Sequence, residues 1–137
     1  MTQLNHAYPL MDSAADWLKS ASGRPLDQVT LEALTAGELS AEDLRVSGTT
    51  LRAQAEIARA AGHPQLADNL SRAAELTAVP NEELLRMYEM LRPGRCAYSE
   101  LMTLAETLDT AYQAPETARL VREAAAVYLA RGLLRTE

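Results

Sequence analysis

Leucine and alanine dominate this chain, and residues that favour β-strands are scarce. Of its 137 residues, 25 are Ala and 22 are Leu. The chain has no Phe, and its β-branched aliphatic residues are limited to Val29, Val46, Ile57, Val79, Val121 and Val127. Ala and Leu have high helix propensity, whereas strands are enriched in β-branched and aromatic residues. The composition therefore predicts an all-α fold.

The length and charge of the chain limit what it can be. A domain of this length buries roughly 70% of the surface that its unfolded chain exposes, so it can fold without disulfides. Its single cysteine, Cys96, excludes an internal disulfide. The formal net charge of -6 disfavours binding to nucleic-acid phosphates. Because the sequence shows neither a signal peptide nor an apolar run of about 18 residues, we expect a cytoplasmic protein.

Capping residues and turn residues divide the chain into helices of different length. Residues 1–11 have no periodic pattern, so we expect an extended arm. Residues 12–46 are predicted to form short helices over 14–20 and 31–36, followed by one or two turns opened by a Ser40–Asp43 capping box. Longer helices are predicted, from their Ser or Pro starts and Gly stops, over 47–61, 64–78, 80–91, 97–112 and 115–131.

The last two of these helices carry the clearest apolar stripes. The stripes consist of Leu101, Leu104, Ala105, Leu108 and Tyr112 on one helix, and Ala118, Val121, Ala125, Tyr128 and Leu129 on the other. This spacing predicts the buried face of a helix. No strand pattern, repeat or polar linker divides the chain. We therefore expect a single compact helical domain over 1–137, with its helical core at 47–137.

The sequence contains no arrangement of residues that indicates catalysis or metal binding. His6 and His63 have no neighbouring ligands, and the six glycines are scattered at turns rather than gathered in a phosphate loop. Arg92 and Arg95 lie close to Cys96 and would favour its thiolate, but no histidine is near enough to act as a base. We therefore assign no catalytic, cofactor-binding or metal-binding residue to this chain.

One segment has the outline of a helix-turn-helix. Residues 39–55 combine a predicted short helix, a Ser47–Gly48 turn and a second helix. Residues 38–59 contain four acidic residues and three arginines, so the basic footprint of a DNA-binding protein is missing. A stand-alone helical adaptor or a helix-turn-helix regulator is nevertheless the alternative function, and an independent small enzyme would require turnover without partners.

Several blocks of the sequence, in a fixed order, carry a family resemblance. The longest block, residues 72–80, reads RAAELTAVP. The other blocks are residues 8–10 (YPL), 30–32 (TLE), 50–55 (TLRAQA), 57–58 (IA), 91–93 (LRP) and 121–125 (VREAA). Together they closely resemble the small (γ) subunit of adenosylcobalamin-dependent diol and glycerol dehydratases, over nearly the whole chain from Tyr8 onward.

The resemblance implies a subunit that is not itself the catalyst. In that family, large, medium and small subunits form a dimer of heterotrimers, and cobalamin lies between the large and medium subunits. An adenosyl radical abstracts hydrogen from a 1,2-diol or glycerol, and hydroxyl migration with loss of water gives the aldehyde. The resemblance thus implies a small subunit that supports the large catalytic subunit and binds no cofactor on its own.

The N-terminal part offers candidate contacts for such a partner. Tyr8, Pro9, Leu10 and Trp17 are aromatic or apolar residues in or next to the expected arm, and such residues dominate interface energetics. Packing of Trp17 on the chain's own helices is an equally good interpretation. Because only seven residues precede Tyr8, the chain resembles the glycerol dehydratase branch rather than small subunits with an N-terminal extension for microcompartments, and encapsulation is not supported.

Three arginines inside the resembling blocks are further candidates. Arg72, Arg92 and Arg122 lie beside apolar positions, where a guanidinium can pair with carboxylates of a partner subunit. Internal pairing, such as Arg72 with Glu75, is at least as good an interpretation. The choice between glycerol and propane-1,2-diol would be made in the large subunit, so this chain does not reveal it.

Overall fold

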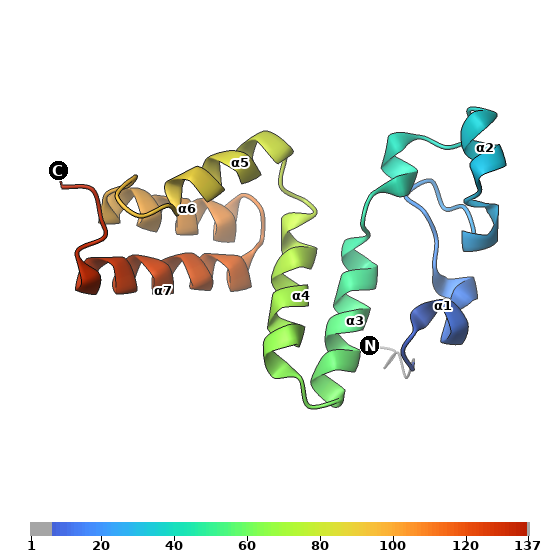
Figure 1. Cartoon of the computed structure of the whole chain (residues 1–137), viewed down its shortest axis with the longest axis horizontal. Coiled ribbons are helices and arrows are strands. Elements are labelled where there is room, and N and C mark those ends of the chain that lie inside the picture. The colour runs from blue at the N-terminus through green and yellow to red at the C-terminus, as the bar shows by residue number, and fades with distance from the viewer. Residues whose placement is uncertain (1–6, 137) are drawn as a thin grey trace. The chain divides into compact units, whose positions relative to one another are not determined.

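All regular elements of residues 7–136, which the computed structural model describes, are helical. The α-helices are α1 Leu10–Ser13, α2 Leu31–Thr35, α3 Gly48–Ala60, α4 Pro64–Leu76, α5 Asn81–Met90, α6 Tyr98–Thr110 and α7 Pro115–Arg131 (Figure 1). Single 3₁₀ turns lie among the first of them: η1 Ala15–Trp17, η2 Leu26–Gln28 and η3 Ala41–Leu44. The prediction of an all-α fold is confirmed.

Local capping signals place the long helices close to their predicted positions. The hydroxyl of Ser47 accepts a hydrogen bond from the Thr50 N–H at 3.3 Å and opens α3. Gly132 follows α7 in the left-handed conformation, with φ 66°, and so ends that helix where a Cβ would be strained. These ends were predictable because each depends on residues within one helical turn.

The predicted helix over 14–20 is wrong. A single α-helical turn, α1, forms earlier at Leu10–Ser13, and the 3₁₀ turn η1 follows it. Leu10 is only 4% exposed and packs with Ala14 and with Ala53 of α3. This tertiary contact holds the chain in a conformation that local propensity does not favour. Residues 1–6 of the expected arm lie outside the described residues.

Contacts divide the chain into two compact units, Met1–Ala74 and Glu75–Glu137, which are described separately below. The boundary falls in the last turn of α4. The expected organisation as one domain, with an arm over 1–11, short helices over 12–46 and a core over 47–137, stays a prediction.

The second unit has a core built by α6 and α7. Its largest fully buried side chains are Leu101, Leu108 and Val121, all three from the predicted stripes, and Val79 and Met87 pack in the same cluster. The tenth member of the stripes, Leu129, is 61% exposed, so its placement in the core was wrong. In α7 the buried face follows positions 118, 121 and 125 and continues with the partly buried residue 128, which leaves position 129 at the edge of that face.

A buried carboxylate anchors the start of α7 in this unit. Ala114, which precedes α7, has no side-chain acceptor for the first N–H groups of the helix. Glu75 supplies one instead. Its Oε1 accepts the Glu116 N–H at 3.0 Å, and its Oε2 accepts both the N–H and the hydroxyl of Thr117, at 2.8 and 2.6 Å. Glu75 thus caps a helix across 42 residues, in place of the pairing with Arg72 that the sequence left open.

Replacing Glu75 with Ala should destabilise the protein strongly. The variant leaves two backbone N–H groups and the buried Thr117 hydroxyl without their acceptor, which we expect to lower the free energy of unfolding by about 3 kcal/mol. Urea denaturation monitored by circular dichroism measures the change. The matched control is Glu106→Ala on the exposed side of α6, expected to change stability by less than about 0.5 kcal/mol. Equal effects in both variants would contradict the capping role.

In the first unit, one carboxylate joins two stretches of chain that have little other support. Oδ1 of Asp43 accepts the Ser20 hydroxyl at 2.8 Å and the Ser22 N–H at 2.9 Å. Oδ2 accepts the N–H and the hydroxyl of Ser40, at 2.9 and 3.0 Å. Hydrogen bonds from Ser22, Ser40 and Ser20 hold the pKa of Asp43 well below its ordinary value of 3.8. The capping box was predicted, but the bonds from 20–22 were not.

The link through Asp43 should make stability depend on pH in a defined direction. Because the folded-state pKa of Asp43 is depressed, the ionised carboxylate stabilises the fold above its ordinary pKa of 3.8, and this contribution is lost as pH falls through the folded-state pKa. Wild type should exceed Asp43→Asn in free energy of unfolding at neutral pH, and the difference should shrink below pH 3.8. Urea titrations at several pH values measure it. The control is Asp27→Asn, which removes an exposed carboxylate. A difference in stability between wild type and Asp43→Asn that does not change with pH would refute the link.

Candidate subunit interface

The N-terminal candidate residues have different surroundings in the structure. Leu10 is buried, and Trp17 is partly buried and packs on the cluster that Leu10 forms with Ala53 of α3. These two residues therefore find apolar contacts within this chain. Tyr8, by contrast, is 72% exposed, and Pro9 is exposed beside it. Leu10 and Trp17 thus fasten the segment, while Tyr8 remains on the surface.

Tyr8 lies at an apolar groove between α3 and α4. The groove has a volume of about 390 Å³ and is lined by Tyr8, Gln54, Ile57, Ala58, Ala61, His63, Leu66 and Leu70. Small residues, Ala55, Ala58 and Ala67, form the contact between the two helices, and small side chains permit close packing. The larger side chains then line the groove, where Leu66 is 50% exposed. Sequence reasoning missed this groove, although Leu66 and Leu70 have the i, i+4 spacing of a helical face.

The three candidate arginines all have partners inside the chain. Arg92 donates to Glu89 at 3.0 Å. Arg122 forms an ion pair with Asp109, and Arg72 donates to the side-chain oxygen of Asn69. Arg92 and Arg122 keep 61% and 41% of their side chains exposed. Internal pairing, which the sequence left open, is therefore present, and these pairs are weak enough at the surface to be exchanged for partner carboxylates.

The segment with a helix-turn-helix outline lacks the first helix of that motif. Within residues 39–55 the structure has the single 3₁₀ turn η3 and then α3. A helix-turn-helix needs a first α-helix that crosses the DNA backbone, and one 3₁₀ turn does not provide it. Together with the acidic composition, this geometry argues against DNA binding through residues 39–55.

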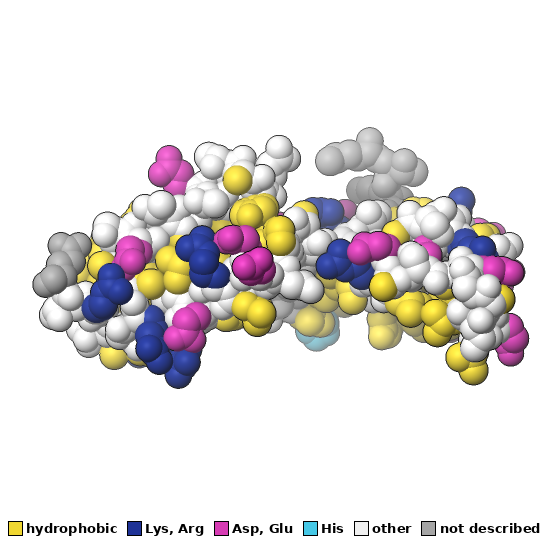
Figure 2. Space-filling view, turned by 90° about the horizontal axis from the view of Figure 1, so that it is seen from above, with side chains coloured by type: hydrophobic (Ala, Val, Ile, Leu, Met, Phe, Trp, Pro, Cys, Tyr) yellow, Lys and Arg dark blue, Asp and Glu magenta, His cyan; other side chains and the backbone are white. Residues whose placement is uncertain are grey.

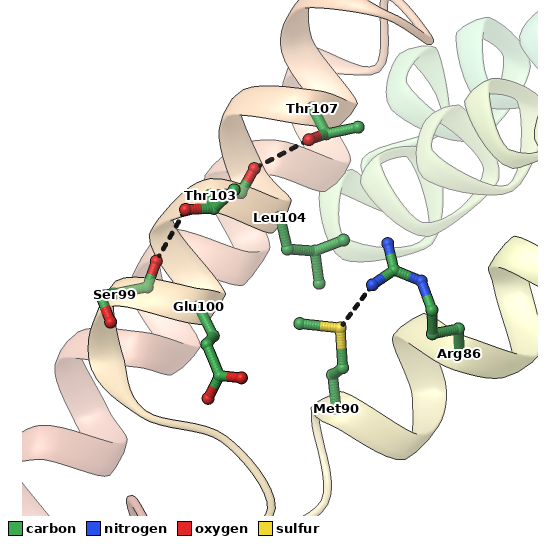
Figure 3. Close-up of a pocket in the computed structure, with 7 residues that line it drawn as sticks. All are labelled: Arg86, Met90, Ser99, Glu100, Thr103, Leu104 and Thr107. Atoms are coloured by element: carbon green, nitrogen blue, oxygen red, sulfur yellow. Dashed lines mark hydrogen bonds between the residues drawn. The ribbon is translucent and has the colours of Figure 1, made fainter. Parts of the chain in front are cut away.

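A second cavity lies between α5 and α6, with a volume of about 260 Å³ (Figure 3). Its glutamate and threonine side chains already have partners. The hydroxyls of Thr103 and Thr107 donate to carbonyls of their own helix, each at 3.0 Å. Glu100 accepts the Ala97 N–H at 2.8 Å and pairs with Arg135 at 2.7 Å. The acid of this cavity is therefore already engaged, and the remaining hydroxyl, that of Ser99, has no histidine beside it in the lining to act as a base.

Cys96 does not have the surroundings of a reactive thiol. It is 7% exposed, and burial raises the pKa of its thiol. The carboxylate of Glu100 raises that pKa further, and Arg135 and Arg86 only partly oppose the two effects. The arginines next to it in sequence, Arg92 and Arg95, instead pair with Glu89. The interpretation of Cys96 as a thiol without a catalytic role agrees with this environment.

Residues 7–136 contain no group of three or more His, Cys, Asp or Glu side chains placed to hold a metal ion. In the same residues no helix is long and apolar enough to cross a bilayer. His6, one of the two histidines, lies outside this range. Apolar groups are exposed in residues 7–136, at the groove and at several Leu and Tyr side chains.

A helical chain with exposed apolar surfaces is typical of a component of a larger assembly. Comparison with known proteins identifies the family. The model of the dehydratase small subunit family matches residues 4–135. The propanediol dehydratase small subunit of Citrobacter freundii is 47% identical over 128 residues, which cover 93% of this chain and 74% of that protein. Its counterpart from Salmonella typhimurium is 44% identical with the same coverage. The chain belongs to the dehydratase small subunit family.

Proposed function

We propose that this chain is the non-catalytic small subunit of a cobalamin-dependent diol or glycerol dehydratase, a lyase that converts a 1,2-diol or glycerol to an aldehyde and water. The observation that carries the proposal is the family match over residues 4–135. Two relatives named propanediol dehydratase small subunit, with 47% and 44% identity, support it. The chain would work in the cytoplasm beside a large and a medium subunit in a dimer of heterotrimers.

Adenosylcobalamin would be held by those other subunits. The two cavities described above, of about 390 and 260 Å³, lie near or below the lower end of the roughly 300–1,000 Å³ typical of pockets for drug-sized ligands. Cobalamin is larger than such ligands, so the residues of these cavities do not fit it. We infer that the contribution of this chain is structural and that its residues stabilise the catalytic subunit by contact.

The groove between α3 and α4 is the first surface that we assign to this contact. Tyr8 is exposed in its lining, with Pro9 next to it in the chain, and Leu10 and Trp17 hold this segment by packing on α3. An apolar partner side chain would bury Tyr8 and Leu66 on binding, and aromatic residues in such positions carry much of an interface's energy. Arg72, Arg92 and Arg122 would add polar contacts with partner carboxylates.

The groove can be tested by placing a charge in it. In co-expression with the large and medium subunits, wild type should co-elute with them in size-exclusion chromatography. Leu66→Asp should lower the amount of small subunit retained at least tenfold, because an unpaired carboxylate would be desolvated on binding. Leu129→Asp, at a similarly exposed position on α7, is the matched control.

The co-elution results distinguish the proposed function from the proposed role of the groove. A wild-type chain that never co-elutes with the other subunits would overturn the proposed function. Wild-type co-elution with full retention of Leu66→Asp would leave the function standing and remove the groove from the interface. Circular dichroism of both variants shows that the helices are intact.

A further inference from the structure

Residues 19–46 of the first unit form a long stretch with almost no core of its own. Only two of these 28 residues, Leu39 and Asp43, are buried, and one of the two is the carboxylate bonded to Ser20, Ser22 and Ser40. Fixing the backbone of one residue costs about 1–2 kcal/mol in conformational entropy. Burial within the chain offsets little of that cost here, so an apolar contact from outside the chain would add to the hydrogen bonds of Asp43 in stabilising this stretch.

The same stretch exposes large apolar side chains. Leu31 and Leu34 of α2 are 70% and 42% exposed, and Leu44 of η3 and the nearby Val46 are 56% and 67% exposed. These four residues, called here the α2–η3 patch, lie within 16 residues of sequence. Hydrophobic side chains gather on the face of this part of the chain at the lower right of Figure 2, with acidic side chains beside them. Exposed apolar patches of this kind mark interaction sites.

The charges around the patch indicate what kind of surface covers it. Residues 19–46 contain five acidic and three basic side chains. Arg24 pairs with Glu38 and Arg45 with Glu42, each at 3.2 Å, which leaves three acidic residues and one basic residue, Lys19, outside these pairs. Glu32 stands next to Leu31 on α2 and is exposed. The complement of this surface is therefore apolar with Lys or Arg side chains at its edge, and a second copy of the same patch would be repelled.

We propose that the α2–η3 patch is a second docking surface, covered in the assembled enzyme by an apolar, basic-edged surface of another dehydratase subunit. This inference rests on the proposed function, because it assumes that the chain has such a subunit as partner. It adds a binding role for residues 19–46 that neither the groove nor the fold of the second unit requires. Docking supplies the apolar contact that the stretch lacks in isolation.

The test uses the full chain co-expressed with the other subunits, with an affinity tag on the large subunit. The double variant Leu31→Glu/Leu34→Glu should reduce the retained small subunit at least tenfold, because it places two charges in an apolar contact. Glu32→Lys should also reduce retention, whereas Glu32→Gln should reduce it less and should weaken its dependence on salt. Leu85→Glu on α5, 71% exposed, is the matched control and should be retained like wild type.

The outcomes separate the two proposals. Failure of wild type to co-purify would overturn the proposed function itself. Full retention of Leu31→Glu/Leu34→Glu beside retained wild type would overturn only the docking surface, and so would equal loss with Leu85→Glu. A wild-type dimer in light scattering that dissociates in the double variant, with retention unchanged, would assign the patch to a second copy and overturn the inference. Circular dichroism and the urea midpoint confirm that the variants are folded.

Discussion

The conformation of the N-terminal part of this protein depends on the hydrogen bonds that a single carboxylate accepts. Asp43 receives two bonds from residues 20–22 and two from Ser40, and these bonds depress the pKa of its carboxyl group. They join the turn that follows η1 to the turn η3. Few apolar contacts act beside them, because Leu39 is the only other buried residue between positions 19 and 46. Polar bonds thus fix the path of the chain, and its apolar side chains are left free to face outward.

In the second unit, by contrast, buried apolar side chains contribute most of the contacts that stabilise the fold. Its helices α6 and α7 bury Leu101, Leu108 and Val121 completely, and the carboxylate of Glu75 satisfies the start of α7. This unit buries its core within the chain, although Leu85, Tyr88 and Leu129 remain exposed on its surface. This difference fits the role that we propose for the chain: one part has a core of its own, and the other would present apolar surface to the subunits that carry out the chemistry.

Features that depend on neighbouring residues were predictable from the sequence. Ser47 opens α3 and Gly132 ends α7 as expected, because a cap acts within one helical turn. Contacts between distant residues were not. Glu75 bonds to Thr117 across 42 positions, and Ser20 bonds to Asp43 across 23. Because the partners are so far apart in sequence, no local pattern predicts either pair. The sequence shows that the residues at the candidate interface are apolar. It does not show that they are exposed, because exposure depends on tertiary packing.

The most direct test of this account is hydrogen–deuterium exchange of the backbone amides, measured in the isolated full chain and in the chain purified with its partner subunits. Amides of α6 and α7 should be protected in both states, because their core lies within the chain. Amides of residues 19–46 should exchange fast in isolation and become at least tenfold slower in the assembly. Equal, fast exchange of residues 19–46 in both states, with the subunits bound, would contradict the claim that a partner covers this stretch.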